Sequence, residues 1–256
     1  MRTIVIMNNK GGVGKTSTCV NVAAILANDY AKRVLVVDAD AQANTTEFFG
    51  GLPGGACSLG NLLRRTDVNP VIRAANYPGV SMIGADDSLM DLDLSSVRSR
   101  IADVAALAKL LDKQRDKYDF VLIDCPPAFN AASAAALLAA DDVIIPIKPD
   151  AFSLRGMGNL MRQIRNMQDI NPRLNLAGLL PTMAYHSTQV RRAMDILYDS
   201  EFNIFPAIRK TTKVDDMTFA QKPLIRSSPK SAACVDYRRF VKAYLAGLEG
   251  GAGNGV

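Results

Sequence analysis

A glycine-rich segment followed by a lysine and a threonine, MNNKGGVGKTS at residues 7–17, has nearly the spacing of a loop that binds nucleotide phosphates. The general pattern is G-x-x-x-x-G-K-[ST], placed between a strand and a helix. In this chain Asn9 stands where the pattern has its first glycine, and Lys10 is an additional cation. The segment therefore predicts a phosphate site with one glycine fewer and one lysine more than usual.

The residue types in this loop suit contact with phosphate oxygens. Glycines allow the backbone to wrap closely with its N–H groups pointing inward, and the start of the following helix adds a positive dipole end. Lys15 is expected to reach the β- and γ-phosphates, and the Thr16 hydroxyl to coordinate Mg²⁺. We expect Thr182 and Met183, at the end of a later strand, to contact the base. The full set predicted to bind the nucleotide is Lys10, Gly11, Gly12, Val13, Gly14, Lys15, Thr16, Ser17, Thr182 and Met183.

Acidic residues follow two other apolar runs. Asp38 and Asp40 lie in VVDADAQ, after a strand that is expected to neighbour the loop, and Asp124 ends the run FVLID. Ligands collect at the carboxyl ends of strands in open α/β sheets. We predict that Asp38 and Asp124 act on Mg²⁺ together with Thr16, and that Asp40 orients the attacking water. Cys125 stands where many ATPases carry a glutamate base, so slow hydrolysis is expected.

Short apolar runs alternate with amphipathic segments along the chain, which indicates βαβ units. Strands are predicted at residues 3–7, 33–38, 80–85, 120–124, 142–147, 176–182 and 203–208. Helices are predicted at residues 16–29, 104–116, 131–140, 154–167, 188–200 and 232–248. The pattern predicts a single α/β domain with a mainly parallel, twisted sheet flanked by helices. We expect this domain to span residues 1–248, and residues 249–256 to form a flexible tail.

Composition argues against several other classes of protein. The chain has 256 residues, a net charge of +5, four cysteines and one histidine, His186. The cysteines are far apart and include no C-x-x-C pair, so neither a zinc site nor a disulfide framework is expected. No apolar run approaches the roughly 18 residues that span a bilayer, and the first ten residues lack the apolar region of a signal peptide. We therefore expect a cytoplasmic protein.

Four segments in order, KGGVGKTS, VDADAQANTT, VLIDCPP and KPDAFSLRGM, resemble the deviant Walker A ATPases of the ParA and MinD group. The resemblance covers residues 2–245 and implies a P-loop NTPase fold that binds ATP and Mg²⁺. In this family a signature lysine, here Lys10, crosses the interface of a homodimer and touches the nucleotide of the other subunit. The resemblance implies catalytic roles for Lys10, Lys15 and Asp40. The family's proline after the second aspartate is replaced by Ala41.

The carboxyl-terminal third of the chain is basic. Between Pro206 and Lys242 there are nine basic residues and three acidic ones, an asymmetry typical of surfaces that bind polyanions. The resemblance is closest to small, Soj-like partition ATPases without an N-terminal helix-turn-helix domain. Such proteins bind nucleoid DNA without sequence preference as ATP-bound dimers, and a ParB-like adaptor stimulates the hydrolysis that releases them. We predict DNA contacts for Arg209, Lys210 and Lys213, which follow a predicted strand.

Two other functions remain compatible with the same motifs. The chain could be a positioning switch for a protein cargo or a cell-division complex, or an ATP-dependent clamp that does not hydrolyse its nucleotide. A MinD-like membrane contact would need an amphipathic helix at the end of the chain. The last residues, EGGAGNGV, have too little apolar surface for this role, so no membrane partner is expected.

Overall fold

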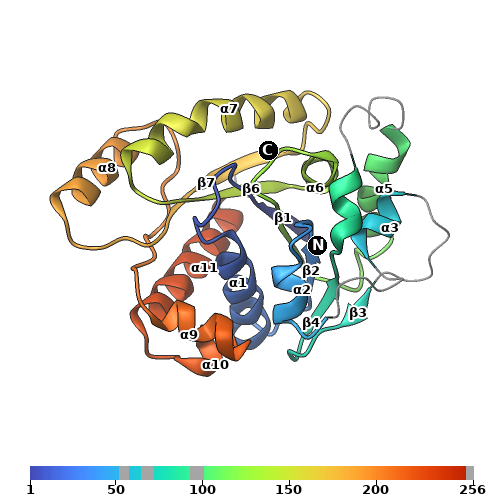
Figure 1. Cartoon of the computed structure of the whole chain (residues 1–256), viewed down its shortest axis with the longest axis horizontal. Helices are drawn as coiled ribbons and strands as arrows, with labels where there is room; N and C mark the ends of the chain where they lie inside the picture. Colours follow the sequence, from blue (N-terminus) through green and yellow to red (C-terminus); the bar gives the residue numbers. More distant parts are fainter. Residues whose placement is uncertain (52–57, 65–71, 93–100, 252–256) are drawn as a thin grey trace.

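The computed structural model describes residues 1–51, 58–64, 72–92 and 101–251. Within these residues seven strands form one sheet in the order β3-β4-β2-β5-β1-β6-β7 (Figure 1). All neighbouring strands are parallel except β3 and β4, so the predicted mainly parallel sheet is confirmed. The strands are β1 (Arg2–Ile6), β2 (Val34–Asp38), β3 (Arg73–Ala74), β4 (Val80–Ile83), β5 (Phe120–Asp124), β6 (Asp142–Ile147) and β7 (Asn175–Pro181).

Helices cover both faces of the sheet and give the domain three layers (Figure 1). Helices α1, α9, α10 and α11 contribute to the core on one face, and α3, α5, α6 and α7 to the core on the other. Their bounds are α1 (Lys15–Asp29), α2 (Asn44–Phe48), α3 (Leu59–Leu63), α5 (Ile101–Asp112), α6 (Ala131–Ala139), α7 (Ala151–Gln168), α8 (Thr188–Tyr198), α9 (Lys213–Ala220), α10 (Leu224–Ser227) and α11 (Ala232–Gly251), with a short 3₁₀ helix, η1 (Asp87–Asp91).

The apolar strands are explained by this double coverage. In β1, Ile4 and Ile6 belong to the core beneath α1 and α11, whereas Val5 belongs to the core beneath α5, α6 and α7. Val36 and Val37 divide in the same way in β2. Because successive strand residues point to opposite faces and both faces are covered, these strands are continuous apolar runs rather than alternating ones.

The predicted strand at residues 203–208 is wrong. This segment runs beside β7, but only Ile204 forms a bridge there, an isolated parallel one with Leu179. Pro206 lies in the middle of the segment and has no N–H to donate to a sheet ladder, so a continuous strand is not expected there. The short elements α2, α3, β3, η1 and α10 were not predicted because each has too few residues to show a clear period.

The order of the strands places one strand between the first two of the chain. β2 does not neighbour β1, because β5 lies between them and pairs with both. Helix α1 therefore carries the chain past one strand position before β2 begins. As a result the strand that ends in Asp124 is the central one of the three.

Part of a further prediction lies outside the described residues. Of the predicted tail at residues 249–256, only residues 249–251 are described. Helix α11 continues to Gly251, three residues beyond the predicted end of the domain. Among the described cysteines, Cys19, Cys125 and Cys234 are buried free thiols.

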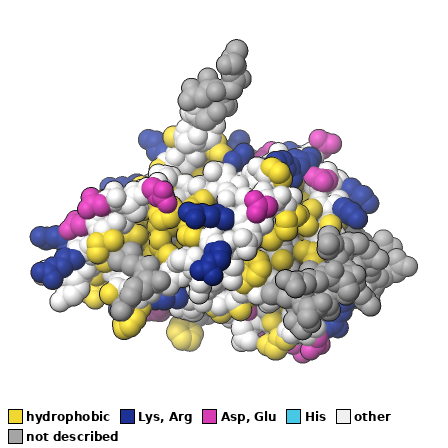
Figure 2. Space-filling model, turned by 90° about the horizontal axis from the view of Figure 1, so that it is seen from above, with side chains coloured by type: hydrophobic (Ala, Val, Ile, Leu, Met, Phe, Trp, Pro, Cys, Tyr) yellow, Lys and Arg dark blue, Asp and Glu magenta, His cyan; other side chains and the backbone are white. Residues whose placement is uncertain are grey.

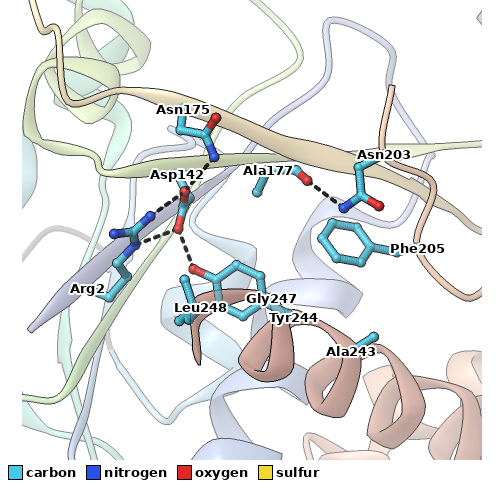
Figure 3. A pocket seen from close by; sticks show the side chains of 10 residues that line it. All are labelled: Arg2, Asp142, Asn175, Ala177, Asn203, Phe205, Ala243, Tyr244, Gly247 and Leu248. Atoms are coloured by element: carbon cyan, nitrogen blue, oxygen red, sulfur yellow. Dashed lines mark hydrogen bonds and ion pairs between the residues drawn. The ribbon is translucent and has the colours of Figure 1, made fainter. Parts of the chain in front are cut away.

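A buried carboxylate holds several elements together at the edge where β1, β6 and β7 begin (Figure 3). Asp142 is 1% exposed and accepts two hydrogen bonds from the Arg2 guanidinium, at 2.7 and 2.8 Å. It also accepts from the Tyr244 hydroxyl at 2.6 Å and from Asn175 Nδ2 at 3.2 Å. These side chains line a cavity of about 490 Å³, with Phe205 on its apolar side. The Tyr244 bond ties α11 to the sheet.

Tyr244→Phe is expected to destabilise the fold without affecting the residues at the carboxyl ends of the strands. The change removes one donor to a buried carboxylate, and a hydrogen bond to a charged group contributes about 1.5–3 kcal/mol. Urea denaturation should therefore show a loss of about that size in the free energy of unfolding. Tyr198→Phe, at a side chain that is 59% exposed, is the matched control and should change stability by less than about 0.5 kcal/mol. Equal stability of the two variants would contradict the role given to Tyr244.

Candidate nucleotide-binding site

The predicted phosphate loop connects β1 to α1. Gly12 and Gly14 have φ angles of 69° and 83°, in the left-handed region that residues other than glycine rarely adopt. Helix α1 begins at Lys15, and no side chain caps its first N–H groups at the N-cap residue Gly14. The positive end of a 15-residue helix therefore meets a loop whose backbone can approach a ligand closely, which suits an anion.

Lys15 is folded against its own loop. The residue is 8% exposed, and its Nζ donates to the backbone oxygen of Lys10 at 3.0 Å. Burial lowers the pKa of Lys15, and the nearby carboxylate of Asp124 opposes this shift. A phosphate on the loop would offer this ammonium group a charge-assisted hydrogen bond in place of a bond to a neutral carbonyl.

Asp124 ends β5, where its register partner on β1 is Ile6. Its Oδ2 atom accepts hydrogen bonds from the hydroxyls of Thr16 and Thr45, both at 2.7 Å. Its Oδ1 atom is buried and has no hydrogen-bond partner among the residues that the structure describes. Burial raises the pKa of Asp124, and the two threonine hydroxyls oppose this shift. Because an unpaired buried oxygen is unfavourable, Oδ1 is suited to coordinate a metal ion or to accept a hydrogen bond from a water bound to one.

Asp38 lies beside Asp124 as its register partner on β2. Its Oδ2 accepts from the N–H and the hydroxyl of Thr46, at 2.8 and 2.7 Å, and its Oδ1 accepts from the N–H of Asp40 at 3.1 Å. Burial raises the pKa of Asp38, and the charge of Asp124 adds to the shift. The structure therefore brings the two carboxylates together, but both oxygens of Asp38 face the following segment. Its contact with Mg²⁺ stays a prediction.

Asp40 is half-buried and begins the turn that leads to α2. Its Oδ1 accepts from the N–H of Gln42 at 3.0 Å. Burial lowers the pKa of Lys15, and the charge of Asp40, like that of Asp124, opposes this shift. This placement is compatible with orienting a water near the phosphates, and that role also stays a prediction.

The donors at this site suit a Mg²⁺ ion that arrives with a nucleotide. Within the described residues, no group of three or more His, Cys, Asp and Glu side chains could hold a metal ion. Mg²⁺ usually takes only one or two protein ligands and completes its shell with waters and phosphate oxygens. The Thr16 hydroxyl and the unpaired Oδ1 of Asp124 are sufficient for that arrangement.

Lys10 extends toward the start of α7. Its Nζ lies 3.5 Å from the Ser153 hydroxyl, 4.0 Å from Asp150 Oδ1 and 5.8 Å from the centroid of the Phe152 ring. Its side chain is 33% exposed. The signature lysine thus rests on a different element from the rest of the loop. Its contact with the nucleotide of a second subunit stays a prediction.

A cavity of about 150 Å³ adjoins the loop on the side of α9 and α11. Thr182 lies there and donates from its hydroxyl to the backbone oxygen of Val13 at 2.8 Å, and Met183 has a left-handed φ of 53°. Both predicted base contacts therefore line this cavity. Sequence reasoning missed several other lining residues, since no motif marks them: Ile208, Thr211, Val214, Asp215 and Tyr237.

The three predicted DNA contacts are not equally available. The Arg209 guanidinium donates two hydrogen bonds to the buried carboxylate of Asp236, both at 2.8 Å. Lys213 makes an exposed ion pair with Asp216 at 2.8 Å. Arg209 and Lys210 also line the cavity beside the loop, so they lie nearer to the nucleotide site than the motifs indicate. Of the three, Lys210 and Lys213 are the better candidates, because an exposed ion pair is weak and easily exchanged.

A second hollow lies between the start of α7 and helix α8, with a volume of about 410 Å³. Exposed apolar side chains border it, among them Phe152 at 73% and Ile196 at 57% exposure. Figure 2 shows this side of the molecule, where apolar side chains lie among lysines and arginines. Because Asp150 and Phe152 line the hollow and also contact Lys10, this apolar surface adjoins the signature lysine.

The fold and the site together define a P-loop nucleotide-binding protein. A family model described as an AAA domain matches residues 1–176. The chain is 31% identical to the chromosome partitioning protein ParA of Caulobacter vibrioides, over 96% of this chain and 94% of that protein. It is 30% identical to the sporulation initiation inhibitor protein Soj of Bacillus subtilis, over 96% and 98%. The chain therefore belongs to the ParA/MinD-type family of P-loop ATPases.

Solved structures agree with this assignment. Cobyrinic acid a,c-diamide synthase from Mycobacterium smegmatis, with bound ADP and magnesium, is 30% identical and has a TM-score of 0.83, over 98% of this chain and 96% of that chain. The cell division ATPase MinD of Pyrococcus furiosus is 21% identical with a TM-score of 0.77, over 96% and 99%, and shows the shared fold. No helix in the described part of the chain has the length and apolar character needed to cross a membrane.

Proposed function

We propose that this protein is an ATPase of low intrinsic activity that binds ATP with Mg²⁺ and uses hydrolysis to switch off an ATP-bound dimer. The proposal rests on one observation at the contact between α1 and β5. Thr16 donates a hydrogen bond to Oδ2 of Asp124, and Oδ1 of the same carboxylate is unpaired among the described residues. A structure 30% identical to this chain holds ADP and magnesium, which supports the same cofactors here.

We assign a separate role in binding or hydrolysis to each residue of the site. Lys15 and the start of α1 bind the phosphates, and Thr16 with Asp124 would hold the Mg²⁺, which neutralises phosphate charge when bound. Asp40 orients the attacking water. Cys125 follows Asp124 where a base could stand, and burial raises its pKa further above the ordinary thiol value. A neutral buried thiol is a poor base, so slow hydrolysis is expected.

Dimer formation would give Lys10 its role. A cation supplied by a partner subunit to the transferring phosphoryl group resembles an arginine finger, which contributes about 10³- to 10⁵-fold in rate where studied. The apolar surface at Phe152 and Ile196 adjoins Lys10, and its burial between two copies would favour association. We propose that this face forms part of the homodimer interface.

The proposed cargo is DNA. Relatives 30% and 31% identical over nearly the whole chain include a chromosome partitioning protein ParA and the protein Soj. The chain also has a net charge of +5 and a basic carboxyl-terminal third. We propose that the ATP-bound dimer contacts nucleoid DNA without sequence preference in the cytoplasm, and that a ParB-like adaptor bound to the segregated DNA stimulates hydrolysis.

One observation favours a protein cargo instead. Arg209 is held by Asp236, and Arg238 and Arg239 also make ion pairs, with Asp29 and Asp236 respectively. These contacts reduce the positive charge that the basic third can offer to phosphates. A positioning switch for a protein complex is therefore the second candidate, and DNA binding separates the two.

We expect binding to unrelated DNA duplexes to require ATP and to weaken steeply with salt. Log affinity falls linearly with log salt concentration, and each phosphate contact adds about 0.9 to the magnitude of that slope. Combining Lys210→Ala with Lys213→Ala removes four lysines from a dimer and should reduce the magnitude of that slope by about 3.6. Fluorescence anisotropy across a salt series measures it.

The control for this experiment combines Lys113→Ala with Lys117→Ala, at exposed lysines near the start of β5. This variant has the same loss of charge and should keep the slope of the parent. ATP affinity is measured in all variants, because Lys210 lines the cavity beside the loop. A parent protein that dimerises with ATP but binds no DNA at low salt would favour the protein cargo.

A further inference from the structure

The carboxylate of Asp124 is held by two hydroxyls from different elements. Thr16 belongs to α1 and Thr45 to α2, and both donate to the same oxygen, Oδ2, at 2.7 Å. A carboxylate oxygen has two lone pairs in its plane, so these two donors fill the acceptor capacity of Oδ2. The other oxygen, Oδ1, is buried and unpaired. The Asp124 carboxylate is therefore held in one orientation, in which Oδ1 is directed away from both threonines.

The Thr16 bond orients that hydroxyl as well. Because the Thr16 hydroxyl donates its hydrogen bond to Asp124, the lone pairs of Thr16 Oγ1 remain available to another partner. A hydroxyl oxygen or a carboxylate oxygen with open lone pairs can coordinate Mg²⁺, or it can accept a hydrogen bond from one of the waters on the ion. Thr16 is part of the recognised loop, but nothing in the loop pattern calls for Thr45.

Thr45 is itself held firmly. It is fully buried, and the next residue, Thr46, donates its N–H and its hydroxyl to Asp38. The Thr46 hydroxyl also accepts from the N–H of Ala85 at 2.8 Å, just beyond β4. Helix α2 is thereby attached to the ends of β2, β4 and β5, and the Thr45 hydroxyl reaches Asp124 from a fixed base.

We propose that Thr45 is a positioning residue for Mg²⁺, which holds the Asp124 carboxylate so that Oδ1 faces the metal position. The inference rests on the proposed function, since it concerns the same Mg²⁺. It adds a residue outside the phosphate loop and links α2, which follows the water-orienting Asp40, to the metal. Groups that orient a metal ligand typically affect metal affinity by about 10- to 100-fold when they are removed.

The test measures the Mg²⁺ concentration that gives half-maximal binding of a fluorescent ATP analogue. Thr45→Val keeps the shape of the side chain but removes the hydroxyl, and Thr45→Ala removes hydroxyl and methyl groups together. Both should raise the half-maximal Mg²⁺ concentration by about 10- to 100-fold. Thr45→Ser keeps the hydroxyl and loses a methyl group, so it should restore the Mg²⁺ dependence of the parent.

Thr3→Val is the matched control, because Thr3 is a buried threonine at the far end of β1. It should leave the Mg²⁺ dependence unchanged, and thermal denaturation checks that each variant is folded. Thr45→Val and Thr45→Ala with the Mg²⁺ dependence of the parent would overturn the inference, as would a Thr45→Ser variant that behaves like Thr45→Ala. If the parent itself shows no Mg²⁺-dependent binding, the proposed function fails instead, which is a different result.

Discussion

Lys15→Ala is expected to abolish measurable binding of ATP in the presence of Mg²⁺. Lys15 is the buried cation of the loop, and within the described part of the chain its ammonium group bonds only a neutral backbone oxygen, that of Lys10. Contacts with the β- and γ-phosphates would replace this bond with two charge-assisted ones, and each such bond contributes about 1.5–3 kcal/mol. Their loss corresponds to a decrease in affinity of about 10²- to 10⁴-fold.

Isothermal titration calorimetry with ATP and Mg²⁺ measures this effect directly. Lys113→Ala removes the same charge at an exposed position in the turn after α5 and should bind like the parent. A fold that is unchanged in both variants, by circular dichroism, shows that the loss is local. If Lys15→Ala bound ATP with the affinity of the parent, the site assigned to residues 10–17 would be wrong.

Asp40→Ala and Lys10→Ala are expected to stop the cycle at different steps. Asp40 is half-buried near Lys15, and the removal of a group that positions the attacking water should lower hydrolysis by about 10²- to 10⁴-fold. ATP binding should persist, so this variant is expected to accumulate as an ATP-bound dimer. Lys10→Ala should bind ATP but fail to form that dimer, because the cation for the partner's phosphates is missing.

Light scattering with and without ATP separates the two outcomes, and phosphate release measures hydrolysis. Lys113→Ala is a suitable control, since Lys113 is an exposed lysine in the turn after α5, outside both the loop and the apolar face proposed as the dimer interface. It should form dimers like the parent. ATP-driven dimers of Lys10→Ala would show that the lysine does not act across the interface.

The local parts of the site follow from the sequence alone. The loop at residues 7–17 is built from neighbouring backbone groups, two glycines with left-handed φ angles and the helix that follows. The spacing of its residues therefore predicts almost all of its geometry. The same holds for Asp124, because an apolar run that ends in an acid places the carboxylate at the carboxyl edge of the sheet. The main helices and six of the predicted strands are also confirmed, since each has a long enough period or apolar run to be recognised.

Only the tertiary structure decided which distant groups meet these local ones. Thr45 reaches Asp124 because β5 lies between β1 and β2, an order that no local pattern contains. Arg209 is held by Asp236 because α11 packs beside the segment after residue 208, and this long-range ion pair weakens a DNA contact that charge alone had predicted. The sequence therefore determined the chemistry within each continuous segment, where spacing sets geometry. Strand order and helix packing determined the partners, because they depend on the whole core.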